Sequence, residues 1–166
     1  SQSIDFKSSG SDSGLATAIG DFLKGQTTVS NLATVLLSGN DKITAKAGNN
    51  VLNGYAGNDT LAGGAGNDVF QFTTALDAST NVEQIVNFKK AGNDSIQLSK
   101  DIFPGYRGAQ DFVTGTATTI DHASIIYNSK TGALSYDSDG TGPSAPIQFA
   151  TLVGKVTLNA ADISLI

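Results

Sequence analysis

The sequence predicts an all-β fold in which short strands stack on one another as a solenoid. Three observations support this prediction. A nine-residue pattern occurs four times in register between residues 36 and 71. Glycine contributes 19 of the 166 residues, and 14 of the 15 acidic residues are aspartate, which turns favour. A helical spacing of apolar residues is confined to the region before the pattern, so strands and turns are expected elsewhere.

Length, charge and composition exclude several classes of protein. A chain of 166 residues corresponds to about one domain. A net charge of -5 excludes a general nucleic-acid-binding protein, which presents a basic face. Because cysteine is absent, the chain has neither disulfides nor thiolate metal ligands. No apolar run approaches the roughly 18 residues that a membrane-spanning helix requires.

The four copies of the pattern share four positions. They read LLSGNDKIT, AKAGNNVLN, GYAGNDTLA and GGAGNDVFQ, and the fifth position is always asparagine. The fourth position is glycine in every copy, at Gly39, Gly48, Gly57 and Gly66. The sixth is Asp41, Asn50, Asp59 or Asp68, and the eighth is Ile43, Leu52, Leu61 or Phe70. A flexible linker, which is the alternative interpretation, would not carry a large apolar residue at every ninth position.

The repeat length predicts how the copies stack. A unit of turn residues followed by about three extended residues is too short for a helix, and glycine at position four lets a neighbouring turn approach closely. If two copies complete one coil, residues 18 apart face one another. Asp41 then lies beside Asp59, and Asn50 lies beside Asp68. Carboxylates among aligned carbonyl oxygens form a cage that suits Ca²⁺ better than Zn²⁺ or Mg²⁺.

The pattern resembles the RTX (hemolysin-type) calcium-binding nonapeptide repeat. This resemblance implies a right-handed parallel β-roll over residues 36–72, with Ca²⁺ as its cofactor. The implied metal-binding residues are Gly39, Asp41, Gly48, Asn50, Gly57, Asp59, Gly66, Asp68 and Asp94. Because Asn50 lacks a negative charge, we expect the site near Asn50 and Asp68 to bind Ca²⁺ more weakly than the site near Asp41 and Asp59.

The region before the repeats predicts a short helical cap over residues 1–35. Leu15, Ile19, Phe22 and Leu23 fall on one face of a helix. A solenoid needs its open apolar end covered, and this helix is the simplest cover. An amphipathic helix on a membrane surface is the alternative, but Lys24 is the only basic residue on this helix.

The region after the repeats, residues 73–166, predicts a roll-closing and C-terminal β-rich part of the same domain, 1–166. Strands are expected at VFQF (69–72), QIVNF (84–88) and SIQLS (95–99). This stretch resembles the segment that closes the roll in serralysin-type proteases and other proteins exported by type I secretion. In that resemblance Asp94 is a calcium ligand, and an ordinary turn aspartate is the alternative.

A β-hairpin is predicted further along the chain, with strands at Ile125–Tyr127 and Leu134–Tyr136. Another strand is expected at Ile147–Phe149. The sequence DSDG at 137–140 suggests an EF-hand, but the twelfth position of such a loop is Pro146 instead of a bidentate glutamate. A turn is therefore expected there, and a weak additional ion site stays open.

The last six residues, Ala161–Ile166, place an acid before a short apolar end. This arrangement resembles the C-terminus of proteins exported by a type I apparatus. Two interpretations are open: an export signal and a final core strand.

No catalytic constellation is found in the sequence. His122 is the only histidine, so zinc motifs with paired histidines are excluded, and a turn or structural role is expected for it. We therefore expect a non-enzymatic function.

The predicted function is a calcium-binding module that folds on Ca²⁺ binding after type I secretion. It would act as the C-terminal folding and secretion domain of a larger protein, extracellular or on a bacterial cell surface. The alternative is a Ca²⁺-dependent module for polysaccharide binding, cell adhesion or S-layer formation. Lysines in or beside the repeats could contact an anionic sugar: Lys42, Lys46, Lys89 and Lys90.

Overall fold

The computed structural model describes residues 5–8, 38–89 and 92–166, and of residues 5–8 it describes the backbone alone. In this part of the chain the structure is mostly strands, with two short 3-10 turns as its helical elements. The prediction of an all-β fold is confirmed there. The helix predicted before the repeats lies outside the described residues. No helix within the described ranges has the length and apolar character needed to cross a membrane.

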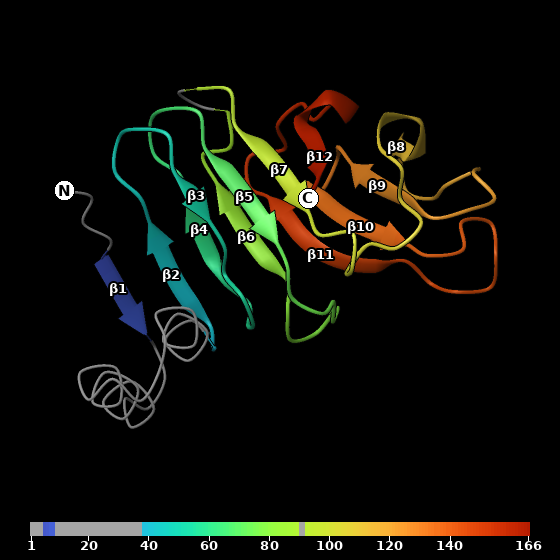
Figure 1. The fold of residues 1–166 in the computed structure, drawn as a ribbon, viewed down its shortest axis with the longest axis horizontal. Helices are drawn as coiled ribbons and strands as arrows, with labels where there is room; N and C mark the ends of the chain where they lie inside the picture. The colour runs from blue at the N-terminus through green and yellow to red at the C-terminus, as the bar shows by residue number, and fades with distance from the viewer. Residues whose placement is uncertain (1–4, 9–37, 90–91) are drawn as a thin grey trace.

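The elements follow one another as short strands separated by turns (Figure 1). They are β1 (Asp5–Ser8), β2 (Asp41–Thr44), β3 (Val51–Leu52), β4 (Thr60–Ala62), β5 (Val69–Phe72), β6 (Glu83–Val86), β7 (Ser95–Leu98), η1 (Ala109–Asp111), β8 (Phe112–Thr114), β9 (Ser124–Asn128), β10 (Ala133–Asp137), β11 (Ile147–Leu152), η2 (Ala160–Asp162) and β12 (Ile163–Leu165). The strands predicted after the repeats and the predicted hairpin are all confirmed.

The strands of the repeats alternate between two sheets. One sheet has the order β1-β2-β4-β6-β11-β10-β9-β8, and the other has the order β12-β7-β5-β3. Within each sheet, strands two repeats apart pair in parallel, with Lys42 opposite Thr60 and Val51 opposite Val69. The predicted stacking of residues 18 apart is therefore confirmed. β1, which the sequence did not predict, pairs antiparallel with β2 at the edge of the first sheet.

The apolar residue of each repeat belongs to one of two buried ladders. Paired strands align the ladder residues across each sheet, and all of them are buried. The first ladder is Ile43, Leu61, Ile85 and Leu152, and the second is Leu52, Phe70, Ile96 and Ile163. Two rungs of each ladder come from outside the repeats. The repeats therefore supply the first half of a stack that β6, β7, β11 and β12 continue.

Aromatic side chains join the stack to the C-terminal strands. Phe149 of β11 meets Phe72 of β5 edge to face, with ring centroids 5.0 Å apart. Phe103 packs edge to face against Phe149 at 5.1 Å and against Tyr136 of β10 at 5.3 Å. Edge-to-face packing of this kind adds about 0.5–1.5 kcal/mol per pair beyond burial. One continuous core thus runs from the repeats into the C-terminal strands.

The C-terminal residues form the last strand of the second sheet. β12 pairs in parallel with β7, and Ile163 is buried against Ile96. The backbone N–H of Ile166 donates to the carbonyl of Leu98. In the folded chain, this segment therefore contains a final strand with one core residue, Ile163, in agreement with one of its two interpretations.

Candidate metal centre

The glycines at position four bring stacked turns into close contact. A Cβ on Gly57 would lie 2.1 Å from the carbonyl oxygen of Gly39, and a Cβ on Gly66 would lie 2.4 Å from that of Gly48. Both Gly57 and Gly66 also have a positive φ, 137° and 134°, which glycine adopts at no steric cost. Only glycine allows these carbonyl oxygens to come so near the next turn.

The asparagines at position five tie the turns together. The Oδ1 atom of Asn40 accepts a hydrogen bond from the N–H of Asn58, and that of Asn49 accepts from Asn67, both at 2.9 Å. The series continues beyond the repeats, because Asn67 Oδ1 accepts from the N–H of Asn93. Each of these asparagines therefore links its turn to the turn stacked on it.

Carboxylates on one side of the stack form a column, Asp41, Asp59 and Glu83, which we call column one. Asp59 Oδ1 accepts a hydrogen bond from the N–H of Asp41 at 2.8 Å. Asp59 Oδ2 is buried and has no hydrogen-bond partner. A Cβ on Gly54 would lie 2.2 Å from this oxygen, so glycine at position one leaves the space that the carboxylate occupies. Glu83 is also buried, and its Oε2 is likewise unpartnered.

The carboxyl groups of column one hold their protons more tightly than usual. Burial raises the pKa of Asp59 to about 6, although the hydrogen bond from the Asp41 N–H lowers it and the Asp41 charge raises it. Burial and then the charge of Asp59 raise the pKa of Glu83 to about 8. Burial also raises the pKa of Asp41. Such shifts mean that the negative charges of column one lack compensating positive charge.

The other side of the stack carries Asn50, Asp68 and Asp94, which we call column two. Asp68 Oδ1 accepts from the N–H of Asn50 at 2.9 Å, and its Oδ2 is buried without a partner. Asp94 Oδ1 accepts from the N–H of Asp68 at 2.9 Å, and its Oδ2 accepts from the N–H of Lys89 at 2.7 Å. Asp94 thus has the contacts of a turn aspartate, and its role as a ligand stays a prediction.

The amide of Asn50 presents its nitrogen to the surrounding oxygens. Its Nδ2 donates to the carbonyls of Lys46 and Gly48 at 2.9 and 2.7 Å. The carbonyl of Gly63 and Asp68 Oδ1 lie farther away, at 3.4 and 3.2 Å. The amide nitrogen of Asn50 thus faces these oxygens, and the role of Asn50 as a calcium ligand stays a prediction.

The donor atoms of the two columns fit a hard cation. Asp59 Oδ2 and Asp68 Oδ2 are carboxylate oxygens that are buried and unpartnered, an arrangement that is costly without a positive charge. Among the described residues, no group of three or more acidic, histidine or cysteine side chains is arranged to hold a metal ion, so a bound ion would take many of its ligands from backbone carbonyls. An all-oxygen set with many carbonyls is typical of Ca²⁺.

Comparison with protein families agrees with this chemistry. Residues 37–70 match the RTX calcium-binding nonapeptide repeat, with four copies. This segment is an RTX repeat block. RTX nonapeptide repeats bind Ca²⁺ and act as structural modules. The match covers the RTX block and not the strands that continue its ladders. Comparison with curated proteins finds no match to the chain.

Glu83 and the glycines at position one were missed by sequence reasoning. Glu83 can be recognised in the sequence from a three-residue pattern, in which an acidic residue is followed by any residue and then by an apolar residue. This triplet occurs as Asp41-Lys42-Ile43, Asp59-Thr60-Leu61 and Asp68-Val69-Phe70 in the RTX block, and again as Glu83-Gln84-Ile85 and Asp94-Ser95-Ile96 after it. A search for the triplet, instead of for the nine-residue period, finds the acid of the next rung.

His122 belongs to a separate cluster that closes a loop on the C-terminal strands. The buried carboxylate of Asp111 accepts hydrogen bonds from the Arg107 guanidinium at 3.1 Å and lies 2.9 Å from His122 Nε2. The other ring nitrogen of His122 lies 2.8 Å from Asp121. Hydrogen bonds to Asp111 and then Asp121 raise the pKa of His122, and those from Arg107 lower the pKa of Asp111 to about 2. This arrangement supports the structural role predicted for His122.

The DSDG sequence forms a turn. Asp137 Oδ1 accepts hydrogen bonds from the N–H of Gly140 at 2.9 Å and from that of Asp139 at 3.3 Å. One oxygen of Asp137 is therefore bound within its own turn, as expected for a turn residue.

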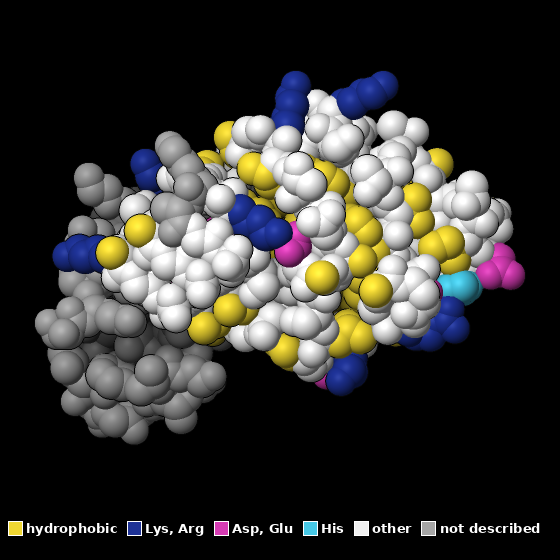
Figure 2. Space-filling view, turned by 90° about the horizontal axis from the view of Figure 1, so that it is seen from above, with side chains coloured by type: hydrophobic (Ala, Val, Ile, Leu, Met, Phe, Trp, Pro, Cys, Tyr) yellow, Lys and Arg dark blue, Asp and Glu magenta, His cyan; other side chains and the backbone are white. Residues whose placement is uncertain are grey.

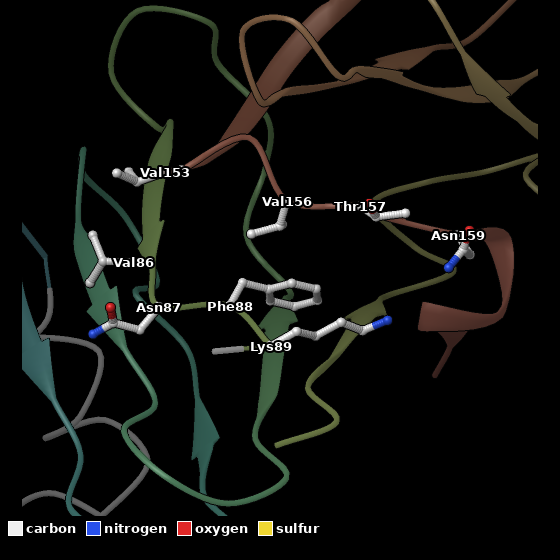
Figure 3. Close-up of a pocket in the computed structure, with 9 residues that line it drawn as sticks. Val86, Asn87, Phe88, Lys89, Val153, Val156, Thr157 and Asn159 are labelled. Atoms are coloured by element: carbon white, nitrogen blue, oxygen red, sulfur yellow. The ribbon is translucent and has the colours of Figure 1, made fainter. Parts of the chain in front are cut away.

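A groove of about 710 Å³ lies beside the end of β6 (Figure 3). Figure 3 shows the Phe88 ring between Val156 and the Lys89 side chain, which extends toward Asn159. Lys89 Nζ forms an ion pair with Asp162 Oδ1 at 2.5 Å, so its charge is already compensated. Figure 2 shows the Lys and Arg side chains of one face spread apart, most of them near its edges and one farther in beside an acidic side chain, without a basic patch. Lys90 lies outside the described residues.

Proposed function

We propose that this chain is a calcium-dependent folding module and that it serves as the C-terminal folding and secretion domain of a larger extracellular protein. The observation that carries this proposal is the pair of buried carboxylate oxygens, Asp59 Oδ2 and Asp68 Oδ2, which have no partner in stacked RTX turns. The ions would be held by side chains and backbone carbonyls of the RTX block. The proposed ligands on the side of column one are Gly39, Asp41, Gly57 and Asp59. Those on the side of column two are Gly48, Gly66, Asp68 and Asp94.

Without a cation, these carboxylates oppose folding. Burying an unpaired charge is costly, and the raised pKa values of Asp59 and Glu83 express that cost. When bound, Ca²⁺ supplies the missing positive charge to the carboxylate and carbonyl oxygens. Binding free energy then becomes folding free energy, and at 100 times the dissociation constant each site adds about 2.7 kcal/mol. The chain would remain unfolded in a calcium-poor cytosol and fold outside the cell.

The proposal includes a fold and a domain assignment. We assign residues 36–72 to a right-handed parallel β-roll, residues 1–35 apart from the strand β1 to a helical cap, and residues 1–166 to one domain. Parallel pairing of strands two repeats apart supports the roll. The core that continues from the RTX block into the C-terminal strands supports a single domain.

The calcium dependence of folding is tested by far-UV circular dichroism in EDTA, in about 10 mM CaCl₂ and in the same concentration of MgCl₂. We expect a β-sheet signal that is largely lost in EDTA, restored by Ca²⁺ and poorly restored by Mg²⁺. Mg²⁺ requires a rigid octahedron of close ligands, which turns rich in carbonyls do not provide. A chain equally folded with and without chelator would disprove calcium-dependent folding.

The export role is tested by deletion of residues 161–166 in a type I secretion assay. We expect the deletion to abolish export. Because the deletion also removes β12, the control is Ile96→Asp, which disrupts the pairing of β12 with β7 and leaves residues 161–166 intact. The control is expected to be exported, since an unfolded chain suits the exporter. Normal export of the deleted chain would return these residues to a purely structural role.

The polysaccharide-binding or adhesion alternative would require a cationic or aromatic surface. The ion pair of Lys89 with Asp162 and the spread of basic side chains in Figure 2 favour the folding module instead.

A further inference from the structure

The side-chain amide of Asn50 lies in a cage of oxygen atoms. Carbonyls from two turns of the RTX block surround its Nδ2, namely those of Lys46, Gly48 and Gly63, and Asp68 Oδ1 completes the set. All four oxygens lie within 3.4 Å of one nitrogen. An amide nitrogen carries two hydrogens, so acceptors outnumber donors at this point. Convergence of carbonyl and carboxylate oxygens on one centre is the environment of a bound cation.

We propose that the amide of Asn50 takes the place of a cation in this cage, so that this turn closes without Ca²⁺. The inference rests on the proposed calcium-dependent folding and deepens it. It assigns the two columns different requirements. Column one depends on a bound ion, whereas at Asn50 the partly positive hydrogens of the side-chain amide take the role of the ion.

Comparison with column one supports this difference. Asp41 stands at the same position of its repeat as Asn50, and its N–H bonds to Asp59 as that of Asn50 bonds to Asp68. An ionised carboxylate has no hydrogen to offer to carbonyl oxygens, so Asp41 cannot donate as the amide of Asn50 does. The role that the amide has at Asn50 is left to a bound cation in column one.

A second difference accompanies the amide. Position one is Gly54 and Gly63 in the last two repeats, where a Cβ would lie 2.2 Å from the buried carboxylate oxygen of Asp59 or Asp68. The second repeat has Ala45 at this position. The space that a position-six carboxylate occupies in the later repeats is therefore reduced by a methyl group beside Asn50.

The experiment converts the cage into a calcium site. Asn50→Asp and the double variant Ala45→Gly/Asn50→Asp are titrated with CaCl₂ by calorimetry, and thermal unfolding is followed at limiting and saturating CaCl₂. The control is Asn49→Asp, which adds the same charge one residue away and keeps the oxygen that accepts from Asn67. A third variant, Asn50→Ala, removes the amide and leaves the oxygens of the cage without their donor.

We expect the double variant to bind one more Ca²⁺ per chain than the wild type, and the Asn49→Asp control to bind the same number as the wild type. At limiting CaCl₂ both Asn50→Asp variants should unfold at a lower temperature than the wild type. Asn50→Ala should unfold at a lower temperature even at saturating CaCl₂. An unchanged number of ions in the double variant would overturn the inference, as would full thermal stability of Asn50→Ala at saturating CaCl₂.

Failure of this inference is distinguishable from failure of the proposed function. If the wild type folds equally in EDTA and in CaCl₂, the calcium-dependent module is wrong. If the wild type responds to CaCl₂ and the Asn50 variants behave as the Asn49 control does, only the role of the amide is wrong.

Discussion

Asp59→Ala is expected to raise the calcium concentration at the midpoint of folding by about tenfold or more, because ligand charge is a main determinant of calcium affinity. The variant removes the central carboxylate of column one, and with it the acceptor for the N–H of Asp41. Asp68→Ala should raise the midpoint by a smaller factor. The turn beside Asp68 retains the Asn50 donor, which already bonds to the carbonyls of Lys46 and Gly48.

The measurement is the midpoint of a CaCl₂ titration followed by far-UV circular dichroism. Asp101→Ala is the matched control, because Asp101 is an exposed acid outside both columns and its loss changes the net charge equally. The midpoint of this control should equal that of the wild type. Equal midpoints for Asp59→Ala and Asp68→Ala would show that the two columns contribute alike, contrary to their different hydrogen bonding.

In EDTA, the folded state is expected to be more stable at pH 5 than at pH 8, and Glu83→Gln should remove most of this dependence. The pKa of Glu83 rises from its ordinary 4.5 to about 8, and that of Asp59 rises from 3.8 to about 6. Both shifts mean that the folded chain binds more protons than the unfolded chain. Stability is therefore lost as pH rises from the ordinary values through the raised ones. For Glu83 the loss is on the order of 3 kcal/mol by neutral pH.

The measurement is urea unfolding of both chains in EDTA across this pH range, with sucrose added at a fixed concentration to populate the folded state of the calcium-free chain. Saturating CaCl₂ should flatten the pH profile of the wild type, since a cation compensates the same charges. The raised pKa of His122 acts in the same direction, because its stabilising charge is lost as pH rises through that pKa. His122→Gln is therefore the control, and it should retain most of the dependence. A Glu83→Gln profile parallel to that of the wild type would contradict the role of Glu83.

The arrangement of the RTX block could be predicted from its period, because a fixed nine-residue interval determines which residues face inward. Ile43 and Leu61 are aligned across paired strands as that interval requires. The period ends after Phe70, and the next rungs follow at longer intervals, so Glu83 was overlooked. The pairing of Ile163 with Ile96 depends on tertiary packing between distant segments, which no local pattern encodes.

The chemistry at residue 50 shows a different limit. Asparagine was predicted to offer an oxygen, because amide oxygens bind Ca²⁺ in many sites. Which end of the amide faces inward depends on the surrounding carbonyls, and these come from two stacked turns, at Gly48 and Gly63. Their convergence is visible only once the turns are stacked.

The two ladders end on Leu152 and Ile163, which follow the RTX block by about 80 to 90 residues of sequence and are therefore synthesised well after it. A nascent chain that has reached residue 100 contains every RTX repeat but leaves Ile85 and Ile96 without their last partners. Pairing over such sequence distances also slows folding, because the chain loses entropy in closing a long loop before the stabilising contacts form. Folding is thus delayed first because the last strands are synthesised late, and then because strands far apart in the sequence must pair. Both delays lengthen the time during which the RTX repeats have been synthesised but the chain is still unfolded.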